Sequence, residues 1–182
     1  MDPDSPSPKS PRQNVVLIGF MGTGKSTIGD RVAQALGFMF VDTDSIIEQT
    51  AKQTIPNIFA NNGEADFRRR ESAALRSLRD GERLVISTGG GIFTIPENVT
   101  IVQELGFVIW LNATEEVIFE RVSKNQNRPL LKSPNPRETI HEVLEQRRSV
   151  YQSCADLEID TTDLTEDEVA FGICESARVK WG

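Results

Sequence analysis

Residues 14–37 read NVVLIGFMGTGKSTIGDRVAQALG, and this stretch decides the fold. It opens with a continuous apolar run, Val15 to Ile18, which predicts a strand buried on both faces, as in a parallel sheet. Apolar residues then recur at helical spacing until Gly37, so a helix follows the strand. Between the two lies GFMGTGKS, residues 19–26, which fits the pattern G-x-x-x-x-G-K-[ST] in the strand–helix context that this pattern requires.

The loop at 19–26 has the residues that bind a polyphosphate. Glycines let successive backbone N–H groups point inward at an anion, and the following helix N-terminus adds partial positive charge. Lys25 can reach the β- and γ-phosphates, and the Ser26 hydroxyl can ligate Mg²⁺. A glycine-rich turn that precedes Lys-Ser by chance is the alternative, which the flanking strand and helix disfavour. The predicted nucleotide-binding residues of this segment are Gly22, Thr23, Gly24, Lys25, Ser26 and Thr27. No Asn/Thr-Lys-x-Asp guanine signature occurs, which favours ATP over GTP.

The rest of the chain alternates predicted strands and helices. Strands are expected at 38–41, 84–86, 107–111 and 157–160, the last of edge type. Helices are expected at about 63–78, around 117–121, up to about 151, and from Thr165 onward. This alternation predicts an α/β fold, in which a parallel sheet of five strands is covered by helices on both faces as three layers, α/β/α.

Length and composition limit the possible classes of protein. The 182 residues suffice for one α/β domain, which we expect over 14–182, and not comfortably for two. Apolar runs are too short to span a membrane, and a net charge of −7 argues against a general nucleic-acid binder. Two cysteines predict reduced thiols in a cytoplasmic protein. Residues 1–13, rich in proline and serine, are expected to be a disordered tail, although a trimmed or cloning-derived terminus would have a similar composition.

A second group of polar residues is expected at the carboxyl ends of two other strands, where open parallel sheets bind ligands. Of Asp42 and Asp44, one could hold Mg²⁺ through water, and the other could orient a hydroxyl acceptor and take its proton. Capping of a following helix is the alternative. Three glycines, residues 89–91, follow the strand at 84–86 and would let a ligand touch backbone amides, unless they form only a flexible turn.

Two arginines are candidates for binding a substrate carboxylate. Arg68 lies four residues after Glu64 and three before Glu71, so both carboxylates can hold its guanidinium on one helix face. Ordinary surface ion pairs are the alternative. Arg147 falls on the apolar stripe of its helix, and an inward arginine needs an anionic partner, either a protein carboxylate or a substrate. Because Arg148 is adjacent, either arginine could face the site, and helical phase favours Arg147.

A basic, proline-broken stretch covers about 125–137 and contains Arg128, with Arg121 just before it. We expect a mobile lid that closes over polyphosphate and excludes water. A solvated surface loop is the alternative.

Taken together, these segments resemble the shikimate kinases. The resemblance runs from about 14 to 177 and rests on GFMGTGKST, VDTDSIIE, IPNIFANNGEADFRRRE, STGGG, NRPLL and the R-x-x-x-Y of RRSVYQSCADLEIDT, in that order. It implies a P-loop kinase fold of the nucleoside-monophosphate-kinase type, with strand order 2-3-1-4-5. It also implies phosphorylation of the 3-hydroxyl of shikimate by ATP, a step of chorismate and aromatic amino acid biosynthesis.

The resemblance also implies roles for individual residues. Lys25, Asp44 and Arg128 would be catalytic, Arg121 and Arg128 would contact the nucleotide, and Ser26 and Asp42 (through water) would hold Mg²⁺. The shikimate-binding residues would be Asp44, Arg68, Gly89, Gly90, Gly91 and Arg147. The family usually has Arg-x-Pro-Leu-Tyr where this chain has Arg-Arg-Ser-Val-Tyr.

The expected partners are therefore the small molecules shikimate and Mg²⁺-ATP, with no nucleic acid and no membrane, and the expected state is a monomer. Two alternatives stay open on the sequence. One is another small-molecule P-loop kinase, such as a gluconate kinase, since gluconate is also an acid. The other is a kinase-like binding protein without catalysis, which the intact phosphate loop and acidic residues disfavour.

Overall fold

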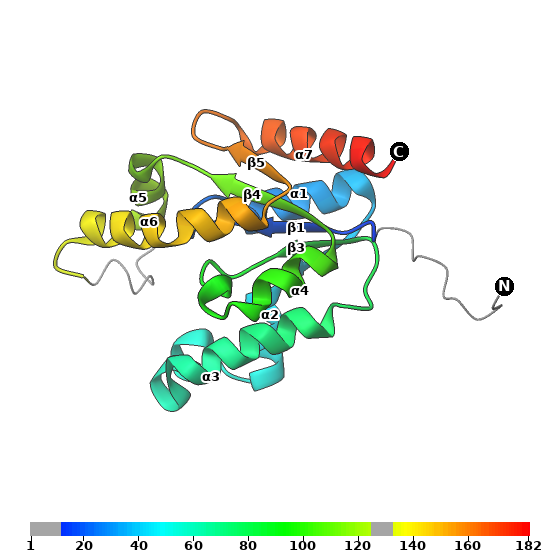
Figure 1. The fold of residues 1–182 in the computed structure, drawn as a ribbon. Coiled ribbons are helices and arrows are strands. Elements are labelled where there is room, and N and C mark those ends of the chain that lie inside the picture. Colours follow the sequence, from blue (N-terminus) through cyan, green and yellow to red (C-terminus); the bar gives the residue numbers. More distant parts are fainter. Residues whose placement is uncertain (1–11, 125–132) are drawn as a thin grey trace.

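The computed structural model describes residues 12–124 and 133–182. Five strands form one parallel sheet in the order β2-β3-β1-β4-β5, which confirms the predicted sheet and its order (Figure 1). The strands are β1 (Val15–Ile18), β2 (Met39–Asp42), β3 (Leu84–Ser87), β4 (Phe107–Asn112) and β5 (Leu157–Asp160). The helices are α1 (Lys25–Leu36), α2 (Thr43–Ala51), α3 (Ile55–Ser77), α4 (Glu97–Leu105), α5 (Glu115–Ser123), α6 (Pro136–Cys154) and α7 (Glu166–Trp181), with a 3₁₀ turn, η1, at Ile92–Thr94.

The sheet lies between two helical layers, and β1 explains why. Its four residues are fully buried, with Val15 and Leu17 packed beneath α1 and α7, and Val16 and Ile18 facing α3, α4 and α6. Successive side chains of a strand point to opposite faces, so a continuous apolar run is required where both faces are covered. Each such side chain contributes roughly 1.5–3 kcal/mol of burial free energy.

Two helical segments were not predicted from the sequence, and a third was considered only as an alternative. Helix α4 contains four consecutive β-branched residues, 99–102, which disfavour a helix, but it buries Ile101, Val102 and Leu105 against the sheet. Helix α2 was expected only in the alternative that Asp42 or Asp44 caps a following helix, and Asp42 does cap it. Helix α3 starts at Ile55, and a non-helical Gly63 (φ 80°, ψ 172°) separates its first part from the predicted part.

The two segments expected to be irregular lie mostly outside the described residues. The predicted tail is described only from Arg12, and the predicted lid only over 133–137, so Arg128 falls outside. Ser133–Asn135 lead into α6, and the guanidinium of Arg137 lies 4.1 Å from the centre of the Phe119 ring. Among the described helices, none is long and apolar enough to cross a membrane.

The register of the strands brings three loops to one edge of the sheet. Ser87, the last residue of β3, pairs with Leu17 of β1 on one side and with Asp42 of β2 on the other. The chain segments that follow these strands therefore start at the same level. They are the loop at 19–24, the start of α2, and the glycines 89–91.

Candidate active site

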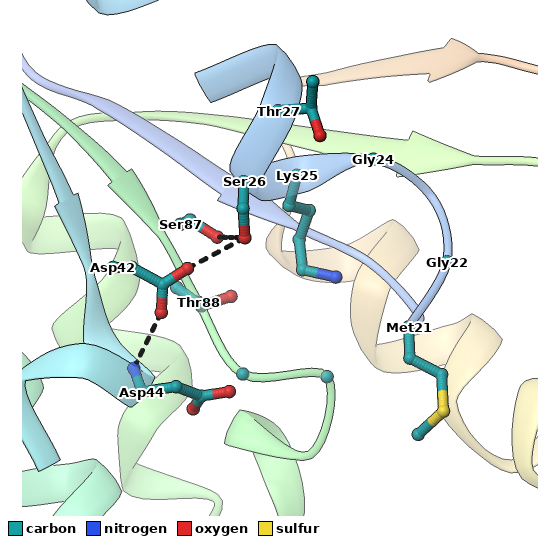
Figure 2. A pocket seen from close by; sticks show the side chains of 12 residues that line it. Met21, Gly22, Gly24, Lys25, Ser26, Thr27, Asp42, Asp44, Ser87 and Thr88 are labelled. Atoms are coloured by element: carbon teal, nitrogen blue, oxygen red, sulfur yellow. Dashed lines mark hydrogen bonds between the residues drawn. The ribbon is translucent and has the colours of Figure 1, made fainter. Parts of the chain in front are cut away.

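The loop between β1 and α1 encloses the amino end of α1. Gly24 caps the helix in the left-handed conformation (φ 89°), which favours glycine, and Thr23 donates from its hydroxyl to the carbonyl of Phe20 at 2.8 Å. A cavity of about 260 Å³ opens beside the loop. The cavity is lined by Met21, Gly22, Gly24, Lys25, Ser26, Thr27, Asp42, Asp44, Ser87, Thr88, Gly89 and Gly90 (Figure 2).

Lys25 places a positive charge at this cavity although only 8% of the residue is exposed. Its Nζ donates to the carbonyl oxygens of Gly19 and Phe20 at 2.9 and 2.8 Å, and Figure 2 shows the side chain pointing into the space that the loop encloses. Burying an ammonium group costs free energy unless it is hydrogen-bonded. The loop carbonyls provide those bonds in this structure, and an anion in the cavity would lie next to the same group.

Asp42 connects the phosphate loop to α2 through both of its oxygens. Oδ2 accepts from the hydroxyl of Ser26 at 2.9 Å, and Oδ1 accepts from the backbone N–H of Asp44 at 2.9 Å, which caps α2 (Figure 2). Asp42 therefore caps α2 and lies beside Ser26 at the same time, so helix capping does not exclude a position at the phosphate loop. Ser87 lies 3.4 Å from Ser26, oxygen to oxygen, and was not singled out from the sequence.

Arg68 lies in the second part of α3 with its guanidinium between two carboxylates. Nη1 donates to Glu71 at 2.7 Å, while Nε and Nη2 donate to one oxygen of Glu64 at 3.1 and 2.9 Å. Glu71 is buried, with 1% of its side chain exposed. Burial raises the pKa of Glu71 above its usual value, an effect that the Arg68 charge opposes and that the Asp44 charge reinforces.

Arg147 and Tyr151, one turn apart on α6, hold the same backbone carbonyl. Arg147 Nη1 and the Tyr151 hydroxyl each donate to the oxygen of Gly90 at 2.7 Å. Tyr151 is buried and packs against Trp110 and Phe93. Arg148 instead pairs with Glu145 at 2.9 Å on the exposed side of α6, so Arg147 is the arginine that faces the glycine segment.

The glycines after β3 provide space for charged side chains. A Cβ at Gly91 would lie 2.4 Å from Arg68 Nη1, and a Cβ at Gly89 would lie 2.7 Å from Glu71 and 3.1 Å from Asp44. Any larger residue would push these groups away. The sequence suggested ligand contact with the glycine backbone, and the structure adds that the glycines let Arg68, Glu71 and Asp44 approach one another.

Arg121 at the end of α5 borders the other side of the phosphate loop. Its guanidinium donates to the hydroxyl and the carbonyl of Thr161 at 3.1 and 2.9 Å, and to the carbonyl of Gly22 at 3.5 Å. It lines a cavity of about 100 Å³ with Thr23, Gly24, Thr161 and Leu164, among others.

The structure thus gathers those predicted residues that it describes at the carboxyl edge of the sheet. Arg121 contacts the phosphate loop at Gly22, while Arg68 and Arg147 contact the carbonyls of glycines 91 and 90. Arg68 and Arg147 line a further cavity of about 360 Å³. Ser87 and Thr88 line the cavity beside the phosphate loop although neither was singled out from the sequence, and Tyr151 was named only as part of the R-x-x-x-Y segment. In that segment the tyrosine follows Arg147 by four residues, which is one helical turn, and this spacing is the signal that could have assigned Tyr151 to the site.

The chain is similar to shikimate kinases both in sequence and in structure. The family model for shikimate kinase matches residues 21–178. The shikimate kinase of Thermodesulfovibrio yellowstonii is 46% identical over 158 residues, which cover 87% of this chain and 91% of that protein. The structure of shikimate kinase from Acinetobacter baumannii in complex with shikimate matches with a TM-score of 0.88 and 34% identity, covering 94% of this chain and 96% of that one.

A gluconokinase from Sinorhizobium meliloti also matches, with a TM-score of 0.61 and 18% identity over 94% of each chain, which shows a shared fold and nothing more. These matches confirm the resemblance to the shikimate kinases that the sequence segments indicated. The chain belongs to the shikimate kinase family.

Proposed function

We propose that this protein transfers the γ-phosphoryl group of ATP to the 3-hydroxyl of shikimate, giving shikimate 3-phosphate and ADP. One observation carries the proposal. Two arginines from distant helices, Arg68 and Arg147, line one cavity beside the glycine segment, and Asp44 lines the neighbouring cavity that contains the phosphate loop. An acid with a hydroxyl a few ångströms from its carboxylate fits this arrangement, with its carboxylate on the arginines and its hydroxyl at Asp44.

The nucleotide would bind along the loop at 19–26. Backbone N–H groups and the amino end of α1 would hold its phosphates, and Lys25 would exchange its carbonyl contacts for phosphate oxygens. Arg121, which already touches the loop through Gly22, would contact the nucleotide on the side away from the acceptor. Arg128 would be a further phosphate-binding residue. This role rests on the resemblance to the family, because Arg128 lies outside the described residues.

The residues near Ser26 fit Mg²⁺. The ion prefers hard oxygen ligands, and in nucleotide sites it takes one or two from the protein and the rest from phosphates and water. Ser26 and the Asp42 carboxylate, 2.9 Å apart, supply such oxygens, and the described residues hold no cluster of three His, Cys, Asp or Glu that would bind a metal independently. Ser26 would ligate the ion and Asp42 would hold it through water. When bound, it would neutralise charge on the phosphates.

The reaction requires one proton transfer, which we assign to Asp44 because this residue lines the cavity beside the phosphate loop. As the 3-hydroxyl oxygen bonds to the γ-phosphorus, the bond from that phosphorus to the β,γ-bridging oxygen breaks and ADP leaves with the electron pair. The hydroxyl proton passes to the Asp44 carboxylate. Phosphoryl transfer depends mainly on positioning and charge stabilisation, so Asp44 acts first by orienting the hydroxyl.

We also propose that the enzyme acts as a cytoplasmic monomer. Cys154 and Cys174 are buried free thiols, as expected for a protein from a reducing compartment. Burial raises the pKa of the Cys154 thiol to about 12, so it stays protonated and unreactive. Light scattering of the purified protein tests the oligomeric state.

ADP release tests the proposed function. Wild-type protein is assayed with Mg²⁺-ATP and, in parallel, with shikimate, quinate, gluconate and nucleoside monophosphates. We expect ADP to form when shikimate is present, and no ADP to form when shikimate is left out. Turnover of gluconate or of a monophosphate, together with none of shikimate, would assign a different acceptor to the same fold.

A further inference from the structure

The two carboxylates on Arg68 differ in burial and in the part of the guanidinium that they use. Glu71 has 1% of its side chain exposed and takes Nη1, whereas Glu64 has 62% exposed and takes both Nε and Nη2 through one oxygen. The carbonyl of Gly91 lies on the Nη1 side at 3.4 Å. A carboxylate that arrives from solvent therefore finds the Nε–Nη2 edge of Arg68 already occupied.

The ion pair between Arg68 and Glu64 borders the cavity where the substrate acid would bind. Glu64, Arg68 and Arg147 all line the same space of about 360 Å³. The Nε–Nη2 edge is one of the guanidinium edges that bind a carboxylate with two parallel hydrogen bonds. In this structure the Glu64 carboxylate uses the donors that a substrate carboxylate would need, and its negative charge repels a second anion in the same cavity.

We propose that Glu64 is a displaceable carboxylate that occupies Arg68 until the carboxylate of the substrate replaces it, so that Glu64 sets the affinity for acidic substrates. This inference rests on the proposed function, since it takes shikimate as the acid. Glu71 has the opposite task. It stays on Nη1 throughout and keeps the guanidinium in position.

The structure explains why Glu64 can leave and Glu71 cannot. Exposed ion pairs contribute little to stability, whereas removing one partner of a buried pair is costly. Glu64 also follows the non-helical Gly63 directly, at the start of the second part of α3. The N–H groups of that first helical turn favour a nearby carboxylate, so Glu64 has an alternative position after displacement.

The experiment compares wild type, Glu64→Gln and Glu64→Ala. Calorimetry measures the binding of shikimate, and steady-state kinetics at saturating ATP gives the KM for shikimate. The first variant removes the charge and keeps the shape, and the second removes the hydrogen-bond acceptor. The control is Glu175→Gln, which makes the same change in net charge on α7, where Glu175 pairs with Arg178. Shikimate methyl ester, which has no carboxylate, serves as the second ligand.

We expect both Glu64 variants to bind shikimate about two- to fivefold more tightly, the size of effect typical of an exposed ion pair. The ester and the Glu175→Gln control should show no such gain, and Glu71→Gln should weaken shikimate binding. Unchanged or weaker shikimate binding in both folded Glu64 variants would overturn the inference, and so would an equal gain with the ester. Absence of both shikimate binding and turnover in the wild type would instead refute the proposed function itself.

Discussion

Replacing Arg68 by alanine should produce two separable losses, one in substrate binding and one in stability. A charge-assisted contact to the substrate carboxylate contributes about 1.5–3 kcal/mol. The KM for shikimate at saturating ATP should therefore rise roughly 10- to 150-fold. ATP binding measured without shikimate should stay nearly unchanged, because the described contacts of Arg68 are to Glu64, Glu71, Gly91 and the Phe67 ring, all outside the phosphate loop.

The loss of stability comes from Glu71, whose buried carboxylate would lose its partner at 2.7 Å. Removing one member of a buried ion pair costs about 3–5 kcal/mol, and for a chain of this size that lowers the Tm by on the order of 10 °C. Because burial already raises the pKa of Glu71, uptake of a proton as pH falls would relieve part of this cost.

A double variant, Arg68→Ala with Glu71→Met, separates the two effects. Methionine has a similar volume and no charge, so the double variant should recover much of the Tm while the KM stays high. Arg70→Ala is the matched control on α3, since it breaks a 2.6 Å ion pair with Asp66 outside the site and should leave the KM unchanged. A wild-type KM in either folded Arg68 variant would refute the assignment of Arg68 to the substrate carboxylate.

Three further predictions concern the charged groups of the site. Lys25→Ala should abolish ADP release while the circular dichroism spectrum is retained, and loss of both together would indicate a structural role. Asp44→Asn should lower kcat more than it raises the KM for shikimate, and a change confined to KM would contradict its role in orienting the hydroxyl. Since the pKa of Glu71 is raised by burial, its contribution to stability is fully present below the usual glutamate pKa and is lost as pH rises through the raised value. Conversely, protonation of Glu71 as pH falls should release Arg68 and raise the KM for shikimate. A pH profile of KM measures this rise, and Glu71→Gln should remove its pH dependence.

The parts of the molecule predicted from the sequence are those set by local patterns. The run Val15 to Ile18 predicts a strand buried on both faces, and its four residues are fully buried. The phosphate-binding residues follow it consecutively in the next loop. Arg147 could be identified because it interrupts an apolar helical stripe. In each case one short segment contains the complete physical reason.

The parts that were missed depend on contacts between distant segments. Ser87 lies beside Ser26 only because β3 is in register with both β1 and β2. Helix α4 forms against its local propensity because packing on the sheet outweighs the cost of its β-branched residues. The need for Gly91 follows from the position of Arg68, 23 residues earlier in the chain. No local pattern contains this information.

The position of the phosphate in the product tests the central claim most directly. If the carboxylate of the acceptor lies on Arg68 and Arg147 and its hydroxyl lies at Asp44, one hydroxyl alone meets the γ-phosphate. We predict that phosphorus and proton NMR of the reaction with shikimate and Mg²⁺-ATP will show a single product, phosphorylated at the 3-hydroxyl. Phosphate on another hydroxyl, a mixture of positions, or no phosphorylated shikimate would contradict the proposed arrangement.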